Sequence, residues 1–364
     1  MSAAVKPVEP ETPYYAKRDR AGFYTWEGVQ YPSVTTILSE APGQHLMLWA
    51  SKMAAMRAAS LLVAAGIKPP EHLAQDDALA DFCEGKDETL TKAEALEKLF
   101  SWQHVMRESE RYRDFKARIG SVTHHALYEN ALGVRVPAKD LEDYLRFVAI
   151  SLGPGIWKDD DLTFKPSEEQ VCELARLAAP YVLSAFEWVE LDKPEWEAIG
   201  QEAVVISLNH GYAGTKDGRA LLRSVNGVAL PEPKVYDLDF KTSNSLAKSV
   251  RFQVEAYRHA DFIGLMATGQ TFPIDSSCGV AALHIGPHAD HAQVSDEFGT
   301  LASKAKIMGA KLWTADGNEE VFNGFLGLLA YYRATNNMPA WDQSRSKKPA
   351  EPKPSKFEAR KCAW

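Results

Sequence analysis

The chain has 364 residues, of which 45% are hydrophobic and 25% charged, as is ordinary for a globular protein that buries a large core. No run approaches the roughly 18 apolar residues of a membrane span, and the N-terminus has no apolar signal segment. We therefore expect a cytoplasmic protein with no membrane partner. A net charge of −8 argues against coating nucleic acid by bulk attraction, but allows an enzyme with a local basic groove.

The first half of the chain is predicted to be mostly helical. Residues 1–13, rich in Pro and Glu, are expected to be disordered, and residues 14–118 to form a hairpin followed by helices. The hairpin turns at Glu27-Gly28 and leads into a helix start rich in Ser and Thr. Further helices are expected over 44–66, 91–119, 138–152 and 167–189. Thr91 with Glu94 has the spacing of a capping box, and Ser167 is a suitable N-cap.

The pattern changes to strands near Glu202. Strands are expected over 203–208, 219–225, 234–240 and 278–285, and helices over 246–266 and 300–335. Residues 223–234 (RSVNGVALPEPK) are expected to form an extended loop. The tail, 341–364, is rich in Lys and Pro and is predicted to be flexible, either solvated or an arm on a nucleic-acid backbone.

Cysteine usage excludes one class of site. The four cysteines, Cys83, Cys172, Cys278 and Cys362, are far apart and form no CxxC pair. A zinc ribbon or a closely spaced metal cluster is therefore not expected, and isolated thiols are the simpler interpretation.

The segment Asp239-Phe240-Lys241 carries the most specific chemical signal. Side chains alternate along a strand, so Asp239 and Lys241 are expected to project together while Phe240 enters the core. Two acids and a lysine suit metal-assisted attack on a phosphodiester, and Asp217 supplies the second acid. Asp237 shares the same parity and competes with Asp239 for this role.

Other polar residues complete an ordered set of motifs. They are Gly120–His124 between two expected helices, Glu202, Gly214–Asp217 at a turn, Asp239–Thr242, and the pair Gln253 and Tyr257 on one helix face. In this order they resemble the PD-(D/E)XK nuclease superfamily, in particular its RecB-type exonuclease branch with many phage members. The resemblance covers about residues 115–290. It implies an α+β fold: a restriction-endonuclease-like mixed sheet flanked by helices over 119–340, with a helical N-terminal extension.

The resemblance implies roles for individual residues. His124, Asp217, Asp239 and the carbonyl of Phe240 would bind Mg²⁺ or Mn²⁺. Lys241 would be the catalytic lysine beside the acids Asp217, Asp239 and Glu202. Gln253 and Tyr257 would contact DNA or support the site, although Tyr257 could equally be a core residue. His125 is expected to face away, about 100° round the helix from His124.

The resemblance also implies a function. It indicates a DNA exonuclease in recombination, repair or replication, in a bacterial or phage-infected cell, working with DNA and with a separate recombinase, single-strand-binding protein or helicase. The chain lacks the clustered iron–sulfur cysteines of some relatives and any P-loop. A structure-specific endonuclease, a non-cleaving DNA-end binder and a helical interaction protein remain alternatives. The cations flanking the motifs are expected either on a solvated face or in a phosphate-tracking groove; they are Lys216, Arg219, Arg223, Lys248 and Arg251.

Overall fold

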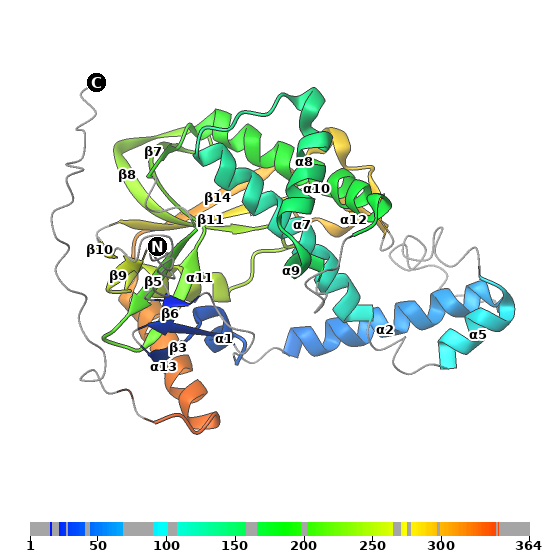
Figure 1. Cartoon of the computed structure of the whole chain (residues 1–364), viewed down its shortest axis with the longest axis horizontal. Helices are drawn as coiled ribbons and strands as arrows, with labels where there is room; N and C mark the ends of the chain where they lie inside the picture. The colour runs from blue at the N-terminus through cyan, green and yellow to red at the C-terminus, as the bar shows by residue number, and fades with distance from the viewer. Residues whose placement is uncertain are drawn as a thin grey trace, which may run out of the picture.

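The computed structural model describes residues 15–16, 22–26, 28–40, 44–67, 90–100, 108–157, 166–197, 202–264, 271–274, 278–296, 299–339 and 341. The fold is α+β, as expected, with helices packed around mixed and antiparallel sheets (Figure 1). Across these ranges no helix is both long and apolar enough to cross a bilayer.

The central sheet has five strands in the order β14-β11-β8-β7-β4. Its strands are β4 (Glu195–Trp196), β7 (Gly218–Val225), β8 (Val228–Lys241), β11 (Gly279–Ile285) and β14 (Ala310–Ala315). Strands β8 and β11 run parallel, and the other neighbours run antiparallel. Gly218 pairs with Leu238 and Ala282 with Asp239, so the end of β8 lies between β7 and β11.

Strands β7 and β8 form one long hairpin, so the extended loop expected over 223–234 is wrong. Asn226 and Gly227 both have positive φ, 53° and 78°, as a two-residue type I′ turn requires. Pro231 and Pro233 lie where the register jumps from the Leu222–Lys234 pair to the Ser224–Ala229 pair. The prolines, which cannot donate to a ladder, are therefore accommodated by an irregularity within a strand.

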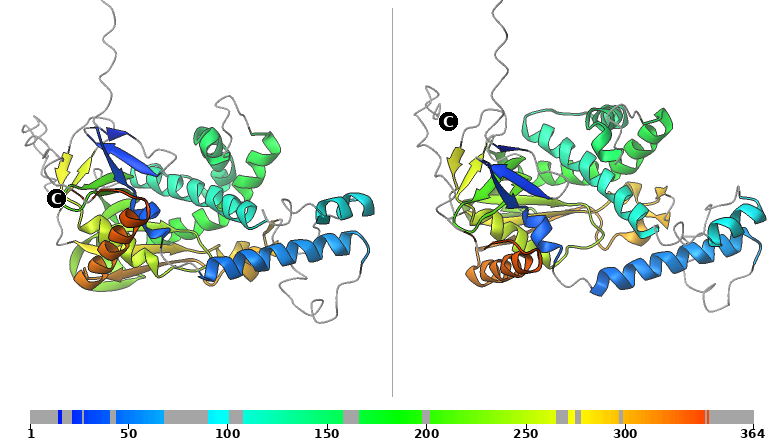
Figure 2. Two further views of the ribbon diagram at one scale, coloured as in Figure 1. Left: turned by 90° about the horizontal axis from the view of Figure 1, so that it is seen from below. Right: turned by 60° about the horizontal axis from the view of Figure 1, so that its bottom comes forward.

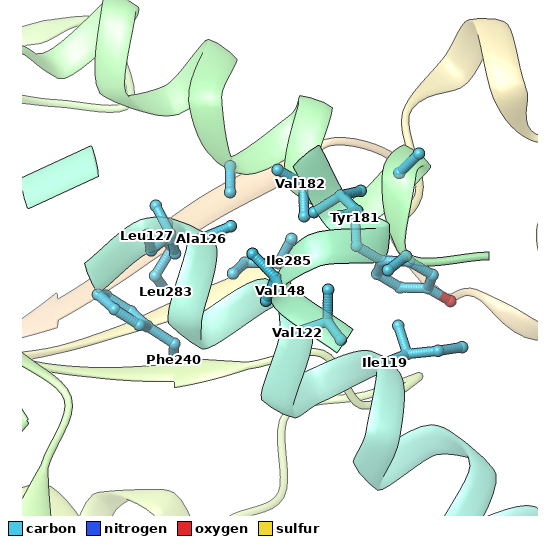
Figure 3. Packing of buried hydrophobic residues seen from close by; sticks show 14 of the residues in the cluster. Ile119, Val122, Ala126, Leu127, Val148, Tyr181, Val182, Phe240, Leu283 and Ile285 are labelled. Carbon is cyan, nitrogen blue, oxygen red and sulfur yellow. The ribbon is translucent and has the colours of Figure 1, made fainter. Parts of the chain in front are cut away.

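Helices α7 (Glu108–Ala131) and α10 (Glu168–Asp192) cover one face of the central sheet, and α8 (Leu141–Ser151) packs on these two helices. The predicted N-cap of α10 at Ser167 is confirmed, and the structure adds a capping box in which Ser167 and Gln170 bond reciprocally. Figure 3 shows Val122 and Leu127 of α7, Tyr181 and Val182 of α10, and Phe240 of β8 converging in the core. Phe240 is 2% exposed, which confirms its predicted inward direction.

The opposite face is covered by α11 (Ser249–Arg258), whose Val250 and Val254 pack on Val280 and Ala282. The helix expected over 246–266 is thus too long, because the chain enters β9 (Phe262–Gly264). The expected helix over 300–335 is also interrupted, by β14. Gly309, with φ of 75°, precedes that strand, and α13 (Glu319–Thr335) follows it.

A second sheet has the order β10-β9-β5-β6. It contains β5 (Ala203–Ser207), β6 (Tyr212–Lys216), β9 and β10 (Thr271–Pro273). The predicted N-terminal hairpin is confirmed as β2 (Phe23–Trp26) and β3 (Val29–Pro32), with β1 (Tyr15–Ala16) beside β2. Helix α1 (Val34–Leu38) follows and lies near α13 (Figure 2). A bridge joins Ser33 to Ala213 of β6.

Helices α2 (Gln44–Ala64) and α5 (Lys92–Phe100) extend from the body as an arm (Figures 1 and 2). The capping box at Thr91 is confirmed: its N–H donates to Glu94 Oε2 at 2.8 Å. Helix α7 runs unbroken through the boundary expected at residue 118, so Gly120–His124 is mid-helix and does not lie between two helices.

Of the expected flexible ends, residues 1–13 lie outside the described residues, as does 341–364 except Trp341. Trp341 is packed, with its indole N–H donating to the carbonyl of Leu208 at 2.7 Å. The remaining short elements are η1 (Ala138–Asp140), α9 (Pro154–Trp157), η3 (Ala289–His291), β12 (Ser295–Asp296), β13 (Gly299–Thr300) and α12 (Leu301–Lys304).

Candidate metal centre

Three side chains from distant parts of the chain converge at the end of β8. His124 comes from α7, Glu202 directly precedes β5, and Asp217 lies between β6 and β7. One ligand atom from each residue lies within 4.8 Å of the other two. His124 Nδ1 is 3.4 Å from Asp217 Oδ1. An imidazole nitrogen and two carboxylates form a donor set that suits Mn²⁺ or Mg²⁺.

Backbone geometry brings these residues together. Gly120 lets α7 approach the end of β8, since a Cβ at this position would lie 2.9 Å from Thr242 Oγ1. Glu202 has a left-handed φ of 47°, uncommon for a residue with a side chain, and its N–H donates to the carbonyl of Asp217. Asp217 Oδ2 accepts the N–H of Phe240 at 2.6 Å. Asp217 is therefore held to Glu202 through its backbone carbonyl and to β8 through its side chain.

Asp239 and Lys241 project together from β8, as predicted, and their side chains form an ion pair. The other oxygen of Asp239 accepts from Gln253 Nε2 at 2.8 Å, and this nitrogen also contacts Tyr257 Oη at 2.9 Å. Gln253 and Tyr257 are 7% and 2% exposed, so they support the site and are too buried to contact DNA. Gly214 gives Tyr257 its space, because a Cβ there would lie 2.5 Å from the ring.

The acids are not equivalent in their electrostatics. Burial raises the pKa of Asp239 to about 6, and the cation of Lys241 opposes this shift only in part. Loss of solvent around the carboxylate of Glu202, together with the negative charge of Asp217, raises its pKa to about 7, although the residue as a whole is exposed. Both acids are therefore partly protonated at a pH of about 6 to 7, where a cation that binds nearby would displace the protons.

The remaining charged groups stabilise one another. Burial would lower the pKa of His124, but the carboxylate of Asp217 outweighs it and raises that pKa. Burial would raise the pKa of Asp217, but His124 and then Lys241 lower it. Burial would lower the pKa of Lys241, but Asp239 and Asp217 raise it. The centre thus carries a fixed carboxylate and a fixed ammonium side by side.

The predicted ligands divide into two groups. His124 and Asp217 lie in the donor cluster together with Glu202, which we had expected to be catalytic and not a ligand. Among the described residues Asp239 lies outside this cluster, because Gln253 and Lys241 hold its carboxylate. That the carbonyl of Phe240 binds an ion stays a prediction. His125 faces Glu129, with Nε2 3.3 Å from Oε1, which confirms that it points elsewhere.

Asp237, the competing acid, belongs to a separate buried network. Its carboxylate pairs with Lys216, lies 3.4 Å from Arg219 Nη1 and accepts from Cys278 Sγ at 3.2 Å. The side chain of Lys216 is 0% exposed and that of Arg219 8%. For Lys216 and Arg219, therefore, neither the solvated face nor the phosphate-tracking groove is correct. Arg223 is exposed and pairs with Glu195.

A cleft of about 360 Å³ opens beside His124 and Lys241. One wall is α7 and the other is the chain following β8; the lining residues include Arg113, Lys116, Ser121, Thr242 and Ser243. None of these five was predicted as functional. The sequence signal for Arg113 and Lys116 was their spacing of three residues and the placement of Lys116 eight residues, about two helical turns, before His124; this spacing has meaning only once one helix covers all three.

No protein-family model matches the chain, and no curated protein matches it in sequence. Function is therefore inferred from the arrangement of the residues described above.

Proposed function

We propose that the chain is a divalent-metal-dependent nuclease that hydrolyses phosphodiester bonds in DNA, as a member of the PD-(D/E)XK superfamily close to its RecB-type branch. The observation that carries the proposal is the convergence of His124, Glu202 and Asp217 beside the Asp239–Lys241 pair. Three donors for a divalent cation and an adjacent ammonium suit metal-assisted hydrolysis of a phosphodiester.

The chain supplies distinct functions at this centre. His124, Glu202 and Asp217 would hold Mg²⁺ or Mn²⁺, which when bound lowers the pKa of a coordinated water and offsets charge on a phosphate. Lys241, held by Asp239 and exposed on the cleft side, presents its ammonium to the attacking water or to the charge that grows on the phosphate. Gln253 fixes Asp239, which in turn fixes Lys241.

Within this class, an exonuclease is the form that the motif order favours. Its substrate would be DNA in recombination, repair or replication in the cytoplasm of a bacterial or phage-infected cell. A recombinase, a single-strand-binding protein or a helicase would be a separate chain.

The test is digestion of end-labelled linear duplex, single strand and closed circular DNA with Mn²⁺ or Mg²⁺. Lys241→Ala and Asp217→Asn should each lower the rate by about 10²-fold or more, since the first removes the ammonium beside the reacting phosphate and the second removes a carboxylate that would hold the metal. Arg223→Ala, an exposed cation outside the site, should leave the rate unchanged.

Each outcome has a defined meaning. Cleavage of linear DNA but not of closed circles supports an exonuclease, and nicking of the circle indicates an endonuclease. Binding without cleavage under either metal would reject hydrolysis and favour a DNA-end binder. Full activity of the Lys241→Ala variant would reject the proposed centre.

A further inference from the structure

One face of α7 forms a continuous wall of the cleft. Arg113, Lys116, Gly120, Ser121 and His124 all line it. Their spacing of three and four residues places them on a single side of a helix, and they lie within the unbroken segment Glu108–Ala131. The wall therefore leads from two cations at one end to the proposed metal ligand at the other.

Arg113 and Lys116 lie along α7 at a distance from His124, beside which the phosphodiester would be cleaved. Lys116 precedes His124 by eight residues and Arg113 by eleven, which corresponds to about 12 Å and about 16 Å along the helix axis. These distances are too long for either cation to act on the phosphate at His124, and suit neighbouring phosphates of the same backbone.

The two cations are held differently. The side chain of Arg113 is 65% exposed and lies 3.3 Å from Asp114. Lys116 is half-buried, and its Nζ donates to Tyr181 Oη at 2.6 Å. Tyr181 is 2% exposed, so this contact anchors the lysine at the cleft wall. A positioned ammonium followed by an exposed guanidinium is a suitable arrangement for successive phosphates.

The cleft is small. The approach of Gly120 to Thr242 joins its two walls, and its volume, about 360 Å³, is near the small end of ligand sites. A space of this size accommodates one backbone, whereas a duplex presents grooves about 12 Å and 6 Å wide between two backbones.

We propose that this face of α7 binds a single DNA strand, with Arg113 and Lys116 binding backbone phosphates adjacent to the one at the metal centre. The inference rests on the proposed nuclease function and names the substrate form that this site takes. It requires that a duplex be separated, at least locally, before its strand enters the cleft.

Binding without turnover tests this inference. Anisotropy of a fluorescent oligothymidylate is measured with the full chain in EDTA over a range of salt concentrations. Each phosphate contact on a single strand adds about 0.7 to the magnitude of the slope of log K against log salt. Arg113→Ala and Lys116→Gln should each reduce that slope by about 0.7 and weaken binding several-fold at low salt.

Matched variants separate the effect of losing a positive charge from an effect on folding. Arg223→Ala removes a cation of nearly equal exposure, 62%, and should leave the slope unchanged. Lys116→Arg should retain the slope, and Tyr181→Phe should retain it too, because the anchor is lost but the charge stays. A blunt duplex of the same length should bind more weakly than the oligothymidylate.

Several results would overturn the inference. They are an unchanged slope in both Arg113→Ala and Lys116→Gln, an equal loss in Arg223→Ala, tighter binding of the duplex, or no salt-dependent binding by the full chain. Cleavage with Mn²⁺ is assayed on the same preparations. Cleavage that persists while the slopes do not change rejects this strand path alone, and absence of cleavage rejects the proposed function.

Discussion

Replacing Asp237 by alanine should lower the free energy of unfolding more than any substitution at the metal centre. The side chains of Lys216 and Asp237 are 0% and 2% exposed, and Arg219 is 8% exposed beside them. Without the carboxylate, two cations remain buried near each other. Breaking a buried pair costs about 3–5 kcal/mol, which is a large part of a typical unfolding free energy of about 5–15 kcal/mol.

Urea unfolding followed by tryptophan fluorescence measures this loss. With a slope of about 3 kcal/mol per molar urea, the midpoint should fall by about 1 M or more. Replacing the pair together, as Lys216→Met with Asp237→Leu, should recover much of the stability, because neither charge is then left buried alone.

Asp239→Asn is the matched comparison on the same strand. Burial raises the pKa of Asp239 to about 6, so at neutral pH its carboxylate is largely ionised and its burial costs stability in the metal-free protein. The amide retains an acceptor for Gln253, and we expect the midpoint to stay the same or rise slightly while cleavage is lost. The reasoning fails if Asp237→Ala shifts the midpoint no more than a surface substitution, or if Asp239→Asn is the more destabilising change.

Three further predictions concern the site and its surroundings. The raised pKa values of Glu202 and Asp239, about 7 and about 6, keep both acids protonated at low pH, so affinity for Mn²⁺ should increase as pH rises from 5.5 to 8 and then level off. Calorimetry in buffers of different ionisation enthalpy should show proton release on Mn²⁺ binding. An affinity that does not change with pH would contradict this prediction. Gly214→Ala should cost about 1–3 kcal/mol by displacing the Tyr257 ring, whereas Gly327→Ala, with open space around it, should not destabilise in the same thermal melt. Burial raises the pKa of the Cys278 thiol to about 12, so iodoacetamide at pH 8 should modify this thiol only after the protein unfolds. Peptide mass mapping measures the modification, and rapid labelling of the native protein would refute the buried position of Cys278.

Local patterns in the sequence were sufficient for the features that depend on neighbouring residues. Strand alternation correctly placed Asp239 and Lys241 together and Phe240 in the core. Spacing identified the capping box at Thr91, and residue type identified the N-cap at Ser167. The Asn226-Gly227 pair is typical of a hairpin turn, yet residues 223–234 were predicted to form a loop, and the prolines in this segment lie at a register irregularity of β8.

Pairings across the fold could not be predicted in this way. Lys216 and Asp237 are 21 residues apart, and their contact depends on how β6, β7 and β8 pack. The choice between Glu202 and Asp239 as the third donor depends on Gln253, which reaches Asp239 from a helix on the far face of the sheet. Composition carries no information about either contact, because each is decided by tertiary packing.

The bridge between Ser33 and Ala213 has a consequence for how the polypeptide can be divided. In the described part of the chain, β6 pairs along its length only with β5, and the Ser33 bridge and the Tyr24–Thr215 hydroxyl contact, 2.8 Å, screen its other side. Removing the first hundred residues to isolate a catalytic fragment would uncover this strand and invite intermolecular pairing and aggregation. The N-terminal hairpin is therefore part of the minimal folding unit.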